Sequence, residues 1–353
     1  MQPNRAGILR FYLRYLAPAA GQYAAPFFHL MPWPFYRQGE GLKVTNNGRK
    51  DWLVRATAAD GQIRCMAAVT TVTVSEAARR HGVSGTVAAA LGRTLTGALL
   101  LGAGQKEFDR LTVQITCDGP VGGITAETNA AGRVRGYVRN PEADAPLNDR
   151  GKFDVRGIVG SGMFYVTYES GFEIGLYTEP YRGSVPLVSG EIGEDFAYYL
   201  AKSEQIPSAV MLGVLMRARE SGETYVEAAG GLMVQVMPGA DERTVAAVEA
   251  SVGRTPHTTA LIRDGATPTD MLRAALGGLP FEVLEEREVG FTCTCSYERA
   301  ISIISSIDRG ELEAMLREDR GAAMTCHFCN ETYRIDEPSL AEIVERNGGA
   351  ASR

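Results

Sequence analysis

The sequence predicts an α+β fold, with a mostly antiparallel-sheet domain, a helical linker and a small cysteine-bearing C-terminal domain. Strand-like runs cluster between residues 51 and 238 instead of alternating regularly with helices, which disfavours a parallel sheet. Short, Ala-rich helical segments follow Pro238 and Gly239. Four of the six cysteines then stand in two tight pairs near the C-terminus. These changes predict four units, at residues 1–50, 51–238, 239–285 and 286–353.

Length and composition allow a sizeable core and limit the class of protein. The chain has 353 residues, of which 45% are hydrophobic, enough for two or three domains. The net charge of −6 argues against a general binder of nucleic acid or acidic membranes, because such proteins need a positive face. Six cysteines in this length do not indicate a secreted disulfide scaffold.

Residues 1–50 are aromatic and apolar, but four prolines interrupt any long helix: Pro18, Pro26, Pro32 and Pro34. The segment contains no apolar run of about 20 residues that could span a membrane. It also lacks the ordered regions of a signal peptide. We expect a poorly ordered extension or a start codon assigned too early. A segment that binds a partner or a membrane surface is the alternative.

The core domain is predicted to begin at Asp51. Residues 51–74 indicate two strands joined by a turn at 59–61, and residues 75–105 indicate a buried Ala/Leu-rich helix. A meander of short strands with glycine turns follows up to residue 188, with alternation at Met163, Tyr165 and Thr167 and at Ile174 and Leu176. A helix is then expected to bury Ile192, Phe196, Tyr199 and Leu200 on one face. Residues 210–216 and 230–238 are apolar enough for two further strands.

The linker, residues 239–285, is predicted to consist of short helices of modest stability. One has Val245, Val248 and Val252 on one side. Another has Thr267 as its N-cap, Pro268 in its first turn and Gly277 at its end. An ordinary helical subdomain explains the same pattern equally well.

The cysteine pairs predict a zinc site in the C-terminal domain. Cys293 and Cys295 are separated by one residue, and Cys326 and Cys329 follow after 30 residues. Zinc prefers four tetrahedral ligands, and thiolates are among its best. Two pairs let one ion hold two distant loops together, and structural zinc contributes about 10–16 kcal/mol to the folding of comparable peptides. Coincidence or plain disulfides are the alternative.

Three other residues need an interpretation. His327 lies inside the second pair, but four thiolates already fill the zinc shell. We therefore expect it to be exposed or beside the ligands, with ligation as the alternative. Cys65 and Cys117 stand alone in apolar surroundings, where each is expected to act as a small buried hydrophobic residue.

The chemistry of the site leaves two interpretations open. Zinc keeps its ligands as thiolates, which are the oxidisable form of cysteine. Disulfides within either pair would close loops of three or four residues and could not span the 30 residues between the pairs. Oxidation within the pairs would then eject the metal and remove the link between the loops. The site is either such a switch or a permanent structural zinc.

The chain resembles the redox-regulated 33-kDa heat-shock chaperone family of bacteria. The resemblance spans residues 51–335 and rests on several motifs together: DWLVRATAADGQIR, GPVGGITAETNAAGRVRGYVRNP, EPYRGSVPLVSGEIGEDFAYYLAKSEQIPSAVMLGV, GGLMVQVMPGAD, FTCTCS and MTCHFCN. Residues 1–50 have no counterpart in it. At His327 an acidic residue would be more typical of the family.

The resemblance implies a cytoplasmic chaperone that holds unfolding proteins without ATP and is not an enzyme. Cys293, Cys295, Cys326 and Cys329 would bind one Zn²⁺ in the reduced, inactive form. Oxidative and heat stress would form the disulfides Cys293–Cys295 and Cys326–Cys329 and release the zinc. The C-terminal domain and linker would unfold, exposing a client surface that the linker covers, and the active form would be a homodimer.

Two rival functions fit parts of the sequence. A zinc-ribbon nucleic-acid module is disfavoured because residues 291–336 hold eight acidic and five basic side chains. A thiol oxidoreductase could use Cys326 and Cys329, but no thioredoxin-like βαβ pattern surrounds them. The glycine-rich segment after Asp118 is not a P-loop, so we expect no nucleotide site. We also expect no membrane partner.

Overall fold

The computed structural model describes residues 50–350 apart from residues 84, 106–107, 149–150, 171–178 and 221–222. Side chains are described up to residue 347. The predicted N-terminal extension, residues 1–49, therefore lies outside the described residues. The same holds for the alternation predicted at Ile174 and Leu176.

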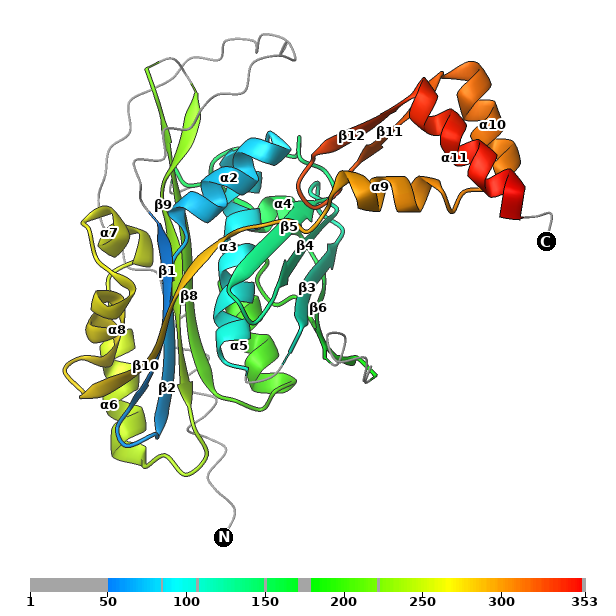
Figure 1. Ribbon diagram of the computed structural model, residues 1–353. Helices are drawn as coiled ribbons and strands as arrows, with labels where there is room; N and C mark the ends of the chain where they lie inside the picture. Colours follow the sequence, from blue (N-terminus) through cyan, green and yellow to red (C-terminus); the bar gives the residue numbers. More distant parts are fainter. Residues whose placement is uncertain are drawn as a thin grey trace.

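The core is built around one long sheet with strand order β7-β6-β3-β4-β5-β10-β1-β2-β9-β8 (Figure 1). Its strands are β1 (Asp51–Ala58), β2 (Ile63–Val69), β3 (Arg110–Cys117), β4 (Gly123–Thr128), β5 (Arg133–Val138), β6 (Gly162–Glu169), β7 (Tyr181–Pro186), β8 (Ser208–Ala218), β9 (Thr224–Val236) and β10 (Phe281–Phe291). Neighbouring strands pair antiparallel, except β5 and β10, which are parallel. The predicted α+β class with a mostly antiparallel sheet is thus confirmed.

The first hairpin forms as predicted, but its second strand is shorter. Ala59 and Asp60 occupy the turn between β1 and β2 with positive φ angles of 50° and 52°. Residues 71–74, expected in the second strand, instead form the first turn of helix α2 (Thr71–His81). The buried carboxylate of Asp51 fixes this start, because it accepts hydrogen bonds from the backbone N–H groups of Val72 and Thr73.

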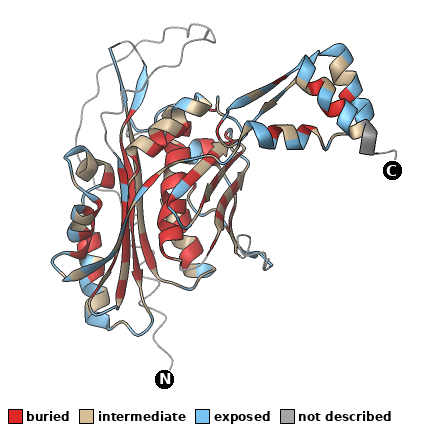
Figure 2. Cartoon of the chain, in the orientation of Figure 1, coloured by how far each residue is buried: buried red, intermediate tan, exposed pale blue. Residues whose placement is uncertain are grey.

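Helix α3 (Gly85–Ala103) is the centre of the main hydrophobic core, with nearly all of its residues buried (Figure 2). Its apolar residues surround the helix, as expected for one enclosed by other elements. Among the described residues, it is the one helix long and apolar enough to cross a membrane. Its most apolar stretch of 18 residues is 94% buried, as expected for the core helix of a folded domain.

The meander between β3 and β7 contains one helical segment that the sequence pattern did not indicate. Helix α4 (Val155–Val159) begins after Asp154, whose side chain accepts a hydrogen bond from the backbone N–H of Gly157. This cap explains why residues expected in the strand meander form a helix instead. Helix α5 (Gly193–Lys202) follows β7, and Ile192, Phe196, Tyr199 and Leu200 are all buried as predicted.

The other face of the sheet is covered by three short helices. These are α6 (Glu242–Val252), α7 (Thr258–Arg263) and α8 (Pro268–Leu276), of which α7 was not predicted. Thr267 caps α8 and Gly277 ends it with φ +61°, as predicted. Val248, Val252, Met271 and Leu272 pack against apolar side chains of β1, β2 and β9 in a second hydrophobic cluster.

Strand β10 joins the linker helices to the cysteine-bearing segment. Residues 281–285, expected in the helical linker, are the first half of this strand, which crosses the predicted boundary at 285/286 without a break. The strand pairs with β1 along its length, from Asp51 opposite Val289 to Ala58 opposite Phe281. Its pairing with β5 is limited to Gly290 with Arg133 and Phe291 with Val134.

The C-terminal segment forms a small module that projects from the sheet (Figure 1). It contains α9 (Tyr297–Ile304), α10 (Arg309–Glu318), the hairpin of β11 (Gly321–Thr325) and β12 (Thr332–Asp336), and α11 (Glu337–Ala350). Asp308 caps α10 as predicted. The module has a small hydrophobic cluster of its own, formed by Ile304, Leu312, Ile335, Leu340, Ile343 and Val344. This core is far smaller than the one around α3 (Figure 2).

Candidate metal and redox centre

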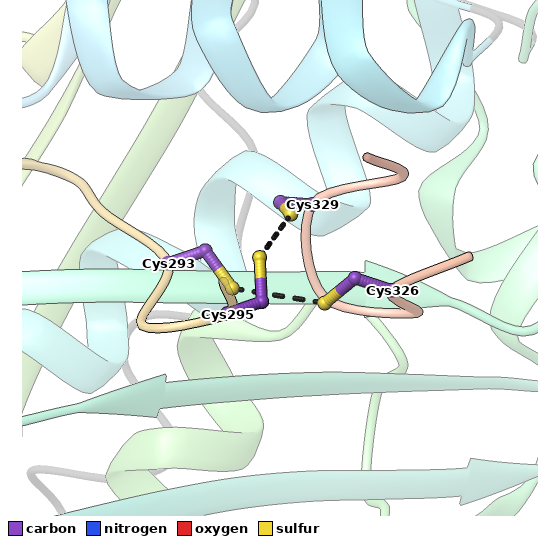
Figure 3. Close-up of side chains that lie close together, drawn as sticks. All are labelled: Cys293, Cys295, Cys326 and Cys329. Carbon is purple, nitrogen blue, oxygen red and sulfur yellow. Dashed lines mark hydrogen bonds between the residues drawn. The ribbon is translucent and has the colours of Figure 1, made fainter. Parts of the chain in front are cut away.

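The four predicted cysteines meet where two loops face each other (Figure 3). Cys293 and Cys295 lie in the first cysteine loop, residues 292–296, between β10 and α9. Cys326 and Cys329 lie in the second cysteine loop, residues 326–331, which connects β11 to β12. The structure therefore brings together residues that are more than 30 positions apart in the sequence.

The spacing of the sulfur atoms suits a tetrahedral metal site. All four Sγ atoms lie within 4.8 Å of one another. The Sγ atoms of Cys293 and Cys326 are 3.7 Å apart, and those of Cys295 and Cys329 are 3.3 Å apart. Thiolates about 2.3 Å from a shared zinc would be separated by about 3.8 Å. The four cysteines could thus hold one ion with small adjustments, and an all-thiolate set favours zinc over a hard cation.

Local backbone hydrogen bonds shape the second cysteine loop. The N–H of Asn330 donates to the carbonyl of Cys326 at 2.8 Å, and the N–H of Cys326 donates to the carbonyl of Glu331 at 2.9 Å. Asn330 adopts a left-handed conformation with φ 58°, which asparagine tolerates better than most residues. These bonds close a tight turn that presents both sulfur atoms of the pair to the first loop.

The surroundings of the four thiols are unequal. Burial opposes ionisation of Cys293, but hydrogen bonds from the Cys295 backbone and from Arg135 outweigh it and lower the pKa of this thiol to about 7. Burial raises the pKa of Cys326 and that of Cys329. The hydroxyl of Tyr333 lies 3.1 Å from the Sγ of Cys295, within reach to donate to it. The protein thus places hydrogen-bond donors where they can stabilise negative charge on the sulfur atoms of Cys293 and Cys295.

His327 and the two remaining cysteines lie apart from this group. His327 is exposed, and its ring centroid lies 6.1 Å from that of Tyr137. It does not join the four clustered cysteines, and its exposure agrees with the exposed position expected for it. Cys65 is buried as predicted, and burial raises its pKa to about 12. Cys117 is only partly buried against the core, and burial raises its pKa as well.

The sequence patterns did not indicate the core residues that contact the centre. Arg135 and Tyr137 in β5 and Arg80 and His81 in α2 all touch the cysteine loops. One signal was available in the alternation of β5, where Val134, Gly136 and Val138 are buried and Arg135 and Tyr137 face the other side. Nothing in that alternation shows which segment would cover the second face.

Comparison with known proteins agrees with this geometry. The family model described as Hsp33 protein matches residues 51–336. A 33 kDa chaperonin of Desulforamulus reducens is 44% identical over 84% of this chain and 98% of its own length. A 33 kDa chaperonin of Enterococcus faecalis is 46% identical over 83% of this chain and 96% of its own length.

A solved structure shows the same fold. The crystal structure of the 33 kDa chaperonin (heat shock protein 33 homolog) of Thermotoga maritima superposes with a TM-score of 0.77 at 34% identity. The match covers 85% of this chain and all of the other. The relatives are named as chaperonins, a class that is not enzymatic. Together with the four clustered cysteines, these likenesses show that the chain belongs to the Hsp33 family of chaperones.

Proposed function

We propose that this protein is a redox-regulated holdase that protects unfolding proteins without ATP. The observation that carries the proposal is the group of four thiols within 4.8 Å, contributed by two loops that contact the sheet domain. In the reduced state one Zn²⁺, bound by Cys293, Cys295, Cys326 and Cys329, holds the two loops together. A bound ion would supply the folding energy that the small cluster in the C-terminal module lacks.

Oxidation is proposed to form the disulfides Cys293–Cys295 and Cys326–Cys329. Each disulfide forms when two thiolates lose two electrons, and a peroxide that takes up these electrons with two protons gives two molecules of water. The two disulfides therefore consume two peroxides and leave no thiolate to hold zinc. Neither bond joins one loop to the other, so the metal-based link between them is lost. Cross-loop pairing of Cys293 with Cys326 would preserve that link, so the proposal depends on pairing within each loop.

The client surface is proposed to lie beneath the linker. Helices α6, α7 and α8 cover an apolar part of the sheet that includes Val54, Ala56, Ile63, Leu232 and Val234. When the loops separate, the end of β10 beyond its pairing with β1 would keep only its two-residue pairing with β5. The linker, residues 239–285, and the C-terminal domain, residues 286–353, would then unfold and expose this surface to unfolding proteins.

The remaining assignments follow from the family and from this mechanism. The active form is proposed to be a cytoplasmic homodimer, in which two exposed apolar surfaces associate. We propose no role for nucleotide, nucleic acid or a membrane in the switch. The sheet domain, residues 51–238, would stay folded throughout.

One experiment tests the proposal directly. Reduced, zinc-loaded protein is treated with peroxide at elevated temperature, and zinc release and suppression of a client's aggregation are followed on the same samples. We expect about one zinc per chain to leave as activity appears, with peptide mapping showing Cys293–Cys295 and Cys326–Cys329. Cys117→Ser is the matched control and should respond like the wild type. Zinc release without a gain in activity would leave the metal as a structural element only.

A further inference from the structure

The C-terminal module touches the rest of the molecule through its cysteine loops. The first loop continues from β10, and the N–H of Thr292 donates to the carbonyl of Val134 in β5 at 2.9 Å. The second loop lies against the C-terminal end of α2 and the side of β5 that faces away from α3. Helices α10 and α11 extend away from the sheet (Figure 1). Attachment of the module thus depends on the same two loops that carry the thiols.

Arg135 contacts both cysteine loops at once. Its Nη1 donates to the hydroxyl of Thr294 at 3.0 Å and lies 3.5 Å from the Sγ of Cys293. Its guanidinium also lies over the ring of Phe328 in the second loop, 4.1 Å from the centroid. A planar guanidinium can donate hydrogen bonds at its edge while its face stacks on an aromatic ring, which a lysine cannot reproduce.

The position of Arg135 is fixed from the sheet. Its Nη2 lies 2.6 Å from the Glu127 carboxylate on neighbouring strand β4, and both side chains are largely buried. Tyr137, two residues further along β5, meets Phe328 edge to face with ring centroids 5.3 Å apart. The outer side of β4 and β5 therefore presents a rigid platform for the two loops.

The end of α2 provides a second attachment for the second cysteine loop. The side-chain amide of Asn330 donates to the carbonyl of Arg80 at 2.9 Å, and the Nε2 of His81 lies 3.2 Å from the carbonyl of Phe328. Arg80 itself faces Glu331 at 3.5 Å and lies near the ring of Phe291, the last residue of β10. These contacts join α2, β10 and the second loop at one point.

We propose that Arg135 is a positioning residue that latches the metal-held pair of cysteine loops to the sheet and so keeps the linker closed. The latch consists of the contacts of Arg135 with Thr294 in the first loop and with Phe328 in the second loop. These contacts can form only while the two loops lie side by side. Metal loss separates the loops and breaks the latch. Loss of Arg135 breaks the latch while leaving all four thiols in place.

The path from the latch to the linker runs through β10. This strand follows α8 after four residues and is followed directly by the first cysteine loop. Beyond Val289, where its pairing with β1 stops, β10 pairs with β5 at only two residues, so the latch adds to a short attachment of this end. Opening of the latch therefore loosens the end of β10 beyond Val289, and the strand leads back from there to the linker helices on the client-binding face. This inference rests on the proposed function and adds a step between metal and linker.

The test distinguishes loss of the Arg135 contacts from loss of the metal. Arg135→Met combined with Glu127→Gln removes the guanidinium without leaving its carboxylate partner charged and buried. Phe328→Ala removes the stacking partner and leaves both charges. Arg309→Gln, which breaks an exposed ion pair with Glu313 on α10, is the matched control within the same module. Each reduced protein is assayed for zinc content, for hydrogen exchange over residues 242–291, and for suppression of client aggregation without oxidant.

We expect both latch variants to retain one zinc per chain and yet to exchange at least tenfold faster over residues 242–291. Partial holdase activity should appear under reducing conditions, and Arg135→Lys should lie between the wild type and the double variant. The control should match the wild type. If both variants keep their zinc and exchange at the wild-type rate, the latch does not exist. If both variants lose their zinc, the latch is also overturned, because loss of the metal would then explain the opening of the linker. Inactivity of the oxidised wild type would instead refute the proposed function.

Discussion

Both faces of the sheet pack apolar side chains against helices, but they are covered in different ways. On one face helix α3 is buried along almost all of its 19 residues. On the other, α6 buries three of its eleven residues, α7 buries only Thr258, and α8 buries five of its nine. A helix enclosed on all sides cannot leave without unfolding its domain. Short helices held by one face can open locally, since regions with little buried apolar surface open at low free energy.

The largest expected effect comes from removing the metal. Chelation of zinc from reduced protein removes a contribution of about 10–16 kcal/mol in comparable sites, more than the small C-terminal cluster can replace. Hydrogen exchange should therefore show loss of protection over residues 292–347 and over α6–α8, while α3 keeps its protection. Cys326→Ser should behave in the same way, because it removes one of the four ligands. Full protection of the module after chelation would contradict this expectation.

Matched alanine substitutions in α3 and α8 compare the stability of the helices on the two faces of the sheet. Leu95 in α3 and Leu272 in α8 are both fully buried, so replacement by alanine should cost about 2–5 kcal/mol in either position. Leu95→Ala should lower the midpoint of unfolding of the whole sheet domain in urea. Leu272→Ala should instead speed hydrogen exchange over residues 242–276 and leave that midpoint nearly unchanged. Equal losses of global stability would show that the linker helices unfold only together with the sheet.

A smaller effect is expected at the start of α8. Thr267→Ala removes the side chain that caps the helix and should cost about 1 kcal/mol of local stability. Hydrogen bonds from the Thr267 hydroxyl and backbone lower the pKa of Asp270 below its ordinary value of 3.8. Because the folded form favours the Asp270 carboxylate, the contribution of this group to the stability of α8 is present above pH 3.8 and is lost as the pH falls below that value.

Hydrogen exchange of α8 at several pH values measures both effects. Thr267→Ser keeps a hydroxyl cap and serves as the control, which should stay close to the wild type. Unchanged exchange in Thr267→Ala at neutral pH would show that tertiary packing alone holds the helix.

The smallest effect is expected on the surface of the C-terminal module. Arg309 and Glu313 form an ion pair one helical turn apart on α10, and both side chains are about half exposed. Such pairs typically contribute less than about 0.5 kcal/mol. Arg309→Gln should therefore change neither the thermal midpoint nor zinc retention measurably. A clear loss of zinc would mean that α10 supports the loops more directly than its contacts indicate.

Much of the fold and the centre could be predicted because local patterns specify them. Thr267, Pro268 and Gly277 mark α8 by capping chemistry, and the spacing of Cys293, Cys295, Cys326 and Cys329 marks the metal site. Strand β10 could not be predicted in this way. Its sequence FEVLEEREVGF buries only Val289 and shows no sustained alternation of apolar residues, because pairing with β1 holds it rather than burial. Arg135 was missed for a related reason, since its role depends on a loop about 190 positions away.

The pairing of β1 with β10 also has a consequence for synthesis of the chain. Lys50 and Glu288, which meet at one end of this pairing, are 238 residues apart. At about 5–20 residues per second, a ribosome needs roughly 12–48 s to make the chain between them. During that time one edge of β1 has no partner strand and can pair with other chains. A nascent chain of this chaperone is thus itself prone to aggregate until nearly the whole protein has emerged.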